Sequence, residues 1–186
     1  MTRNFELPEP AIVPDLDPGF RPPVLANRAF CDAVHEAGGG VPFGIALQRH
    51  GGQVARFDTR VFPPGDPNGS ANYAYIERII KFLLWQKGAW RVYAGGHKNL
   101  AQFVCYLLSS LGPLSFDSAF MGEWVYGTPF EVQVTTYSGL PPVNESGKRE
   151  HNTRWEGWRI GFDLGASDRK VALVKDGKLA LDASGE

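Results

Sequence analysis

Apolar residues recur at intervals of three and four along two stretches of the chain. The first stretch runs from Ser70 to Lys87, and its apolar positions are Ile76, Ile79, Ile80, Leu83 and Leu84. This spacing places the apolar side chains on one face of a helix, which Gly88 is suited to terminate. The second stretch, Leu100 to Leu111, predicts another amphipathic helix that ends at Gly112-Pro113.

Shorter apolar or alternating stretches around these helices predict strands. They are Gln53–Phe62, which stops at a Pro- and Gly-rich loop, Trp90–Ala94, Phe120–Tyr126 and Phe130–Tyr137. Gly127-Thr-Pro129 separates the last two and is typical of a tight reversal. The order of elements predicts an α/β accessory domain over residues 42–137, built on a mixed sheet with packed helices.

The flanking segments lack a regular apolar pattern. Residues 1–41 are rich in proline and glycine and predict an extended arm, with room for only a short helical turn at Phe30–His35 before Gly38-Gly-Gly40. Residues 138–157 gather glycine, proline and charged residues and predict a linker. A new unit, residues 158–186, is expected to follow this linker.

The most informative chemistry lies in this last unit, where a strand, a small-residue turn and a second strand follow one another. Apolar residues flank the turn on both sides: Ile160, Phe162 and Leu164 before it, Val171, Leu173 and Val174 after it. Gly165 and Ala166 leave room for phosphate oxygens to approach the backbone, and Ser167 adds a hydroxyl and an amide. Asp163 could hold magnesium through water, and Lys170 could add positive charge.

These residues resemble a known family. Asp163-Leu-Gly-Ala-Ser167, followed by Lys170-Val-Ala-Leu-Val174, is similar to the first phosphate motif of the actin, Hsp70 and sugar-kinase superfamily, and most similar to that of the ROK family. The resemblance implies the first β-hairpin of a ribonuclease-H-like (actin-like) ATPase lobe. It also implies Asp163 near magnesium, with Gly165, Ala166 and Ser167 at the phosphates of ATP and Lys170 beside them. The implied reaction is transfer of the γ-phosphoryl group to a sugar hydroxyl.

The resemblance covers only the amino-terminal portion of such a kinase. Upstream, Asp58–Gly65, Lys81–Gln86 and Phe120–Tyr126 resemble the extension of an unusual ROK-like subgroup. The later catalytic aspartate, the sugar-binding loop, the second phosphate loop, the adenosine site and the zinc motif have no counterpart. We therefore expect a truncated kinase with no catalytic residue of its own and weak or absent nucleotide binding. A half-paired last strand would favour a homodimer or a partner chain.

The alternative hypothesis is a non-enzymatic binding or assembly module in which the hairpin is purely structural. An ordinary hairpin also uses Gly and Asp in its turn, so the local pattern alone does not separate the two hypotheses. The family resemblance favours nucleotide binding.

Composition limits the class of partner and the compartment. The 186 residues carry 19 basic and 20 acidic side chains, a formal net charge of -1, which predicts binding to neither nucleic acid nor an anionic membrane. Cys31 and Cys105 stand alone, so neither a disulfide framework nor a zinc site is indicated, and a cytoplasmic location is expected. Nothing resembles an export signal or the roughly 18 apolar residues of a membrane span.

Other candidate groups have structural explanations that we favour over functional ones. Gly95-Gly-His-Lys98 could offer helix-terminal amides to an anion but is more typical of a strand-to-helix turn. His35, His50, His97 and His151 lie in separate segments without the spacing of metal ligands. The five tryptophans could stack on a sugar, yet such residues usually pack a core. Asp58, Asp117 and Glu123 are not shown to converge, so no hydrolase is indicated.

Overall fold

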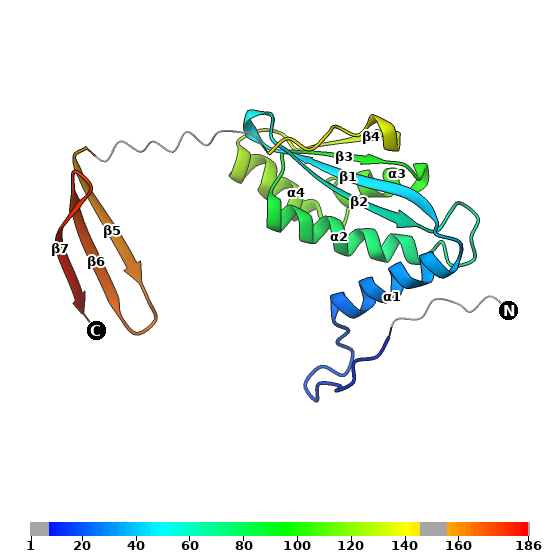
Figure 1. The fold of residues 1–186 in the computed structure, drawn as a ribbon, viewed down its shortest axis with the longest axis horizontal. Helices are drawn as coiled ribbons and strands as arrows, with labels where there is room; N and C mark the ends of the chain where they lie inside the picture. Colours follow the sequence, from blue (N-terminus) through cyan, green and yellow to red (C-terminus); the bar gives the residue numbers. More distant parts are fainter. Residues whose placement is uncertain (1–7, 146–155, 186) are drawn as a thin grey trace. The chain divides into compact units, whose positions relative to one another are not determined.

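The computed structural model describes residues 8–145 and 156–185, which belong to two compact units, Met1–Gly147 and Lys148–Glu186 (Figure 1). The first unit is mixed α/β, with helices packed on a mixed sheet, as the sequence predicts. The second unit is a small antiparallel sheet.

The sheet of the first unit has four strands in the order β2-β1-β3-β4. Their bounds are Val41–Gln48 for β1, Val54–Val61 for β2, Arg91–Gly95 for β3 and Glu131–Thr135 for β4. Strand β1 is antiparallel to both β2 and β3, whereas β3 and β4 are parallel. The sequence predicted β2, β3 and β4 but missed β1, the strand between β2 and β3.

Strand β1 was not predicted because Pro42 and Gly44 interrupt the apolar pattern expected of a strand. Both residues fit the sheet for reasons that depend on their neighbours. Pro42 precedes the residues that pair with β3, which begin at Gly44, so its missing amide costs no hydrogen bond on that side. At Gly44 a Cβ atom would collide with the side chain of Leu140.

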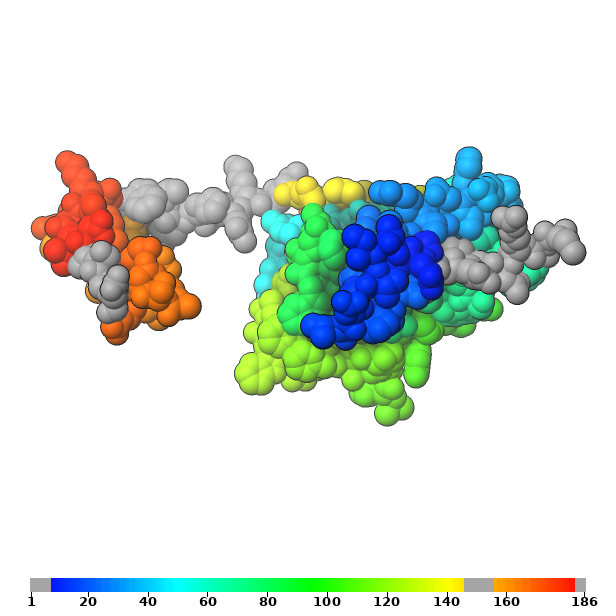
Figure 2. Space-filling view, turned by 90° about the horizontal axis from the view of Figure 1, so that it is seen from below, coloured from blue at the N-terminus to red at the C-terminus, as the bar shows by residue number. Residues whose placement is uncertain are grey.

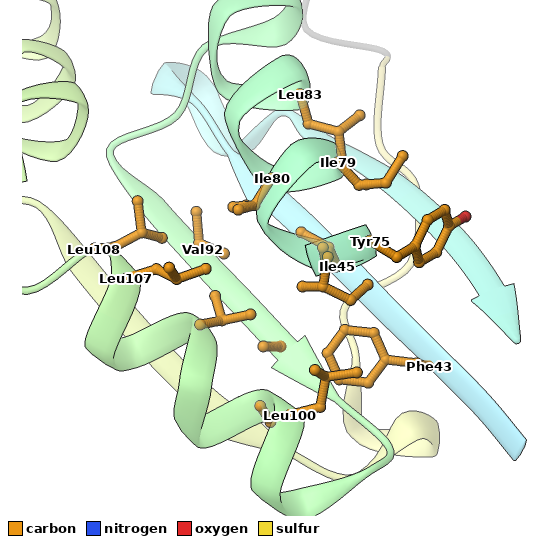
Figure 3. Close-up of a cluster of buried hydrophobic side chains, with 14 of the residues drawn as sticks. Phe43, Ile45, Tyr75, Ile79, Ile80, Leu83, Val92, Leu100, Leu107 and Leu108 are labelled. Carbon is orange, nitrogen blue, oxygen red and sulfur yellow. The ribbon is translucent and has the colours of Figure 1, made fainter. Parts of the chain in front are cut away.

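Helices α2 (Ala71–Lys87) and α3 (Lys98–Leu107) cover one face of this sheet (Figure 3). Their apolar stripes meet Phe43, Ile45 and Val92, and the whole cluster is excluded from solvent. Helix α2 confirms the predicted helix, and Gly88 ends it with a φ of 70°. Helix α3 ends earlier than predicted, and Leu111 beyond it is 87% exposed.

Helix α1 (Pro23–Glu36) corrects the expected extended arm over residues 1–41. Proline is tolerated in the first helical turn, where its missing amide has no intrahelical partner and its fixed φ suits the helix, so Pro22 and Pro23 introduce α1. Ala26, Phe30 and Val34 are buried at intervals of four. The Phe30 ring stacks on Tyr75 of α2 with 4.0 Å between centroids.

The strand predicted at Phe120–Tyr126 is wrong. These residues form a π-helix that directly continues the short helix α4 (Ser115–Ala119). A Cβ atom at Gly122 would lie 2.8 Å from the carbonyl oxygen of Thr128, so glycine lets this turn approach the following chain closely. Gly127, with a φ of 62°, then ends the helix.

The expected linker over residues 138–157 is wrong for its first part, because residues 138–145 pack against the sheet instead. Leu140 is only 5% exposed and lies over Gly44 and Gly95, on the sheet face opposite the helices. The backbones of Asn144 and Val54 exchange hydrogen bonds of 2.8 and 2.9 Å. Residues 146–155 of the predicted linker lie outside the described residues.

The second unit contains strands β5 (Trp158–Leu164), β6 (Arg169–Lys175) and β7 (Lys178–Gly185), ordered β5-β6-β7. The predicted strands on either side of Gly165–Ser167 do pair, with Phe162 opposite Val171. Strand β7 was not predicted. The sequence feature that could have indicated it is Asp176-Gly177, a pair common in hairpin turns. Their φ values of 51° and 78° are typical of a tight two-residue turn.

We expect Leu140→Ala to lower the free energy of unfolding of the first unit by about 2–4 kcal/mol, because it leaves a cavity between the sheet and residues 137–145. Urea unfolding of the full chain, followed by tryptophan fluorescence, measures this change. The control Leu111→Ala removes an exposed leucine and should stay within about 0.5 kcal/mol of the parent protein. Equal effects of the two substitutions would contradict the packing described for Leu140.

The buried hydroxyl of Tyr75 predicts a pH dependence. Burial raises its pKa from 10.0 to about 12, while Thr59 shares a 3.0 Å hydrogen bond with it. The unfolded chain therefore releases this proton first, so the stability contributed by neutral Tyr75 is complete below pH 10 and is lost as the pH rises towards 12. Ultraviolet titration should show a late component to which Tyr75 contributes, alongside Tyr126, whose pKa is also raised by burial. Tyr75→Phe should reduce that component, and an unchanged titration curve would be inconsistent with the buried site.

Candidate phosphate-binding hairpin

Strands β5 and β6 bring two of the predicted site residues together. Asp163 lies directly opposite Lys170 in the antiparallel register, so their side chains share one face of the sheet. The Lys170 Nζ atom is 4.0 Å from Asp163 Oδ2 and 2.8 Å from Asp168 Oδ2. Lys170 thus sits between two carboxylates, and Asp168 is a site residue that the sequence analysis missed.

The turn between these strands contains the other predicted residues, Gly165, Ala166 and Ser167, all of which are exposed. A Cβ atom at Gly165 would lie 2.5 Å from Asp168 Oδ1, so a larger residue here would displace the Asp168 side chain. The backbone at Gly165 does not have a positive φ. The space that a side chain at Gly165 would fill is thus taken up by the Asp168 carboxylate, and the unusual backbone conformation that glycine also permits is not used.

The charged groups of this site are open to solvent. The exposed side-chain fractions are 69% for Asp163, 53% for Lys170 and 39% for Asp168. Ion pairs this exposed contribute little to stability, so they hold the hairpin weakly and can exchange partners. Two carboxylates and one ammonium group carry a net negative charge, so a phosphate group would need a bridging cation or the displacement of Asp168 from Lys170.

Asp163 is the residue suited to hold magnesium, because a carboxylate at a strand end can bind the hydrated ion through one of its waters. Within residues 8–145 and 156–185, no three potential metal-ligating side chains of His, Cys, Asp or Glu cluster together. A site here would therefore take most of its ligands from water and from the phosphates themselves. The donor set fits magnesium better than a metal that prefers nitrogen or sulfur.

The opposite face of the same sheet is apolar. Cross-strand pairs Ile160–Leu173, Phe162–Val171 and Leu173–Leu181 share that face. Phe162 is 68% exposed and Leu164 is 75% exposed, and Leu181 is also open to solvent. Leu179 pairs with Val174 and lies on the other face. A three-stranded sheet normally needs its apolar face covered, so this surface is suited to packing against further polypeptide.

The other candidate groups have separate structural roles. His97 caps helix α3 by accepting a hydrogen bond from the Leu100 amide at 3.4 Å, in agreement with the favoured structural explanation of Gly95–Lys98. Asp58 forms an ion pair with Arg56 on β2, whereas Asp117 is buried and accepts a hydrogen bond from the Trp85 indole. Glu123 lies on the π-helix. These three carboxylates thus lie on separate elements, and Asp58 and Asp117 have different partners.

The tryptophans show both packed and exposed arrangements. Trp85 stacks on Phe120, and Trp90 packs under the guanidinium of Arg91. Trp124 is 80% exposed, and Trp158 lies beside Lys175 in the second unit. Trp155 and His151 lie outside the described residues.

Comparison with protein-family models, with curated proteins and with solved structures found no match to this chain. Within the described residues, none of the helices has both the length and the apolar character needed to cross a membrane.

Proposed function

We propose that the hairpin Asp163–Lys170 binds the phosphates of magnesium-ATP as part of a ribonuclease-H-like (actin-like) ATPase lobe of the ROK sugar-kinase type. The observation that carries this proposal is the cross-strand pair of Asp163 and Lys170 beside the exposed Gly165–Ser167 turn. An acidic group for the cation, a cationic group for the phosphates and a turn free of large side chains occupy one end of the hairpin.

Each residue has a distinct role in this proposal. Asp163 accepts hydrogen bonds from the waters of the magnesium ion, and the amides and hydroxyl of the turn donate to phosphate oxygens. Lys170 exchanges its contact with Asp168 for one with phosphate, at little cost because the ion pair is exposed. The proposal assigns binding to these residues and assigns no catalytic residue. Transfer to a sugar hydroxyl needs a general base and a clamp supplied by other parts of a full lobe.

The two faces of the β5-β6-β7 sheet support membership of a larger lobe. The phosphate-binding groups lie on the polar face, and the apolar face is free for the helices that such a lobe packs on its sheet. Cys31 and Cys105 are free thiols, which fits a protein that works in the reducing cytoplasm.

A second candidate function is binding or assembly without catalysis. The exposure of large apolar side chains across one sheet face favours it, because such surfaces commonly mark protein interfaces. In that case the turn residues only connect β5 to β6. The two functions differ in whether the turn responds to nucleotide.

Titration of the isotopically labelled full chain with magnesium-ATP should shift the backbone NMR signals of residues 163–170. We expect Ser167→Asp to abolish these shifts, because it places a negative charge among the phosphate-binding amides. Lys170→Met should weaken binding about tenfold through loss of one charge-assisted contact.

The matched control is Lys178→Met, which removes the same charge at the start of β7, away from the turn. It should leave binding unchanged. Nucleotide-induced shifts that persist in Ser167→Asp, or the absence of shifts in the parent chain at millimolar nucleotide, would contradict the proposed function. Loss of the sheet itself in Ser167→Asp would instead favour a purely structural turn.

A further inference from the structure

An apolar groove of about 820 Å³ runs between helices α1 and α2 in the first unit. Its floor is formed by Phe57, Ile79 and Leu83, and Val24 and Phe82 stand along its sides. Both side residues are 60% exposed. This surface lies away from the phosphate-binding hairpin in sequence and belongs to the other unit.

The groove carries positive charge. Arg28, Arg78 and Lys81 line it, and none of the lining residues is acidic. Arg78 donates a 3.2 Å hydrogen bond to the Asn27 side chain, and Lys81 is 3.9 Å from Asp117. Arg28 makes no hydrogen bond or ion pair with another described residue. An occupant should therefore combine apolar side chains with carboxylates.

Residues 8–20 of this chain have this composition. The segment contains Glu9, Asp15 and Asp17, has no lysine or arginine, and includes a proline at every second to fourth position. Ile12 is 86% exposed and Leu16 is completely exposed. Proline-rich segments bind aromatic-lined grooves at low entropic cost because their extended backbone is already restricted.

The segment does not occupy the groove of its own chain. Arg21 closes it into a loop by donating to the carbonyl oxygens of Pro18 and Phe20, both at 3.0 Å, and to Glu9 at 3.1 Å. Pro23 is the first residue along the chain that lines the groove, so residues 8–20 are not part of its lining. Figure 2 shows the segment in dark blue on the surface of the unit. The loop leaves Ile12 and Leu16 without cover while it stays beside the start of α1.

We propose that the α1–α2 groove of one copy binds residues 12–20 of a second copy, and that the exchange is reciprocal. Leu16 and Ile12 enter the apolar groove, and Asp15 and Asp17 face Arg28 and Arg78. A reciprocal exchange gives a closed two-fold dimer in which each copy supplies one segment and one groove. The opposite charges select the register and make the dimer sensitive to salt.

Sedimentation velocity of the full chain over a concentration series tests this interface. Leu16→Asp should raise the dimer dissociation constant about a hundredfold, since about a tenfold loss is expected at each of two identical grooves. Arg28→Glu should also weaken the dimer, and added salt should weaken the parent dimer. The control Leu111→Asp changes another largely exposed leucine, outside the groove, and should leave the dissociation constant unchanged.

Mixing two variants separates exchange between copies from other arrangements. Leu16→Asp disrupts binding by the segment and leaves the groove intact. Phe82→Asp disrupts the groove and leaves the segment intact. Both positions are exposed, so both variants should fold. Each variant alone should be largely monomeric, and the mixture should form heterodimers through the one intact groove and segment.

Three outcomes would overturn the proposal. The first is a monomeric parent chain at all concentrations. The second is a dimer that neither variant weakens, which would place the contact elsewhere, for example on the apolar face of β5-β6-β7. The third is the absence of heterodimers in the mixture, which would indicate that the segment folds back onto its own groove.

Discussion

The first unit depends on burial of strand β1 on both of its faces. Phe43, Ile45 and Leu47 point towards the helices, whereas Gly44 and Ala46 lie under residues 137–145. The small residues on the second face are what allow Leu140 to approach the sheet. Because β1 also pairs with β2 and β3, any displacement of it would disturb both layers and the sheet at once. Residues 137–145 are therefore part of the fold and not a connection to the next unit.

The sequence predicted those helices and strands whose apolar pattern and terminating residues lie within or directly beside the element itself. Helix α2 has an apolar stripe and a terminating glycine, and β2, β3 and β4 have short apolar or alternating runs. Strand β1 could not be predicted because the residue that explains Gly44 is almost a hundred positions away in sequence. The same prolines that suggested an extended arm start helix α1, since proline suits both an extended chain and a first helical turn. The short apolar pattern at Phe120–Tyr126 does not reveal the π-helix, because the close approach of Gly122 to residues 128–130 is a contact outside the segment.

The sequence predicts part of the candidate site, because the residue pairs of an antiparallel hairpin follow from the position and length of its turn. A turn of Gly165–Ser167 alone would place Asp163 opposite Arg169. The loop also includes Asp168, so that Leu164 pairs with Arg169 and Asp163 pairs with Lys170. Asp168 was missed because its position between Gly165 and Lys170 depends on the shape of the turn, which the small residues do not specify by themselves. Ala166 and Ser167 are both exposed in the turn, and their proposed roles at the phosphates rest on the family resemblance.

The apolar face of the β5-β6-β7 sheet and the charged pair on its other face are physically linked. Two unit charges about 4 Å apart interact with about 1 kcal/mol in bulk water, but with about four times as much near a protein surface where the effective dielectric constant is lower. The interaction between Asp163 and Lys170 is closer to the value in bulk water, because both side chains are largely exposed. Polypeptide that covers Phe162 and its neighbours would order the strands and restrict the turn, which lowers the entropic cost of binding a phosphate there. If the hairpin binds phosphate as proposed, its affinity would therefore depend on what covers the apolar face as well as on the residues of the turn.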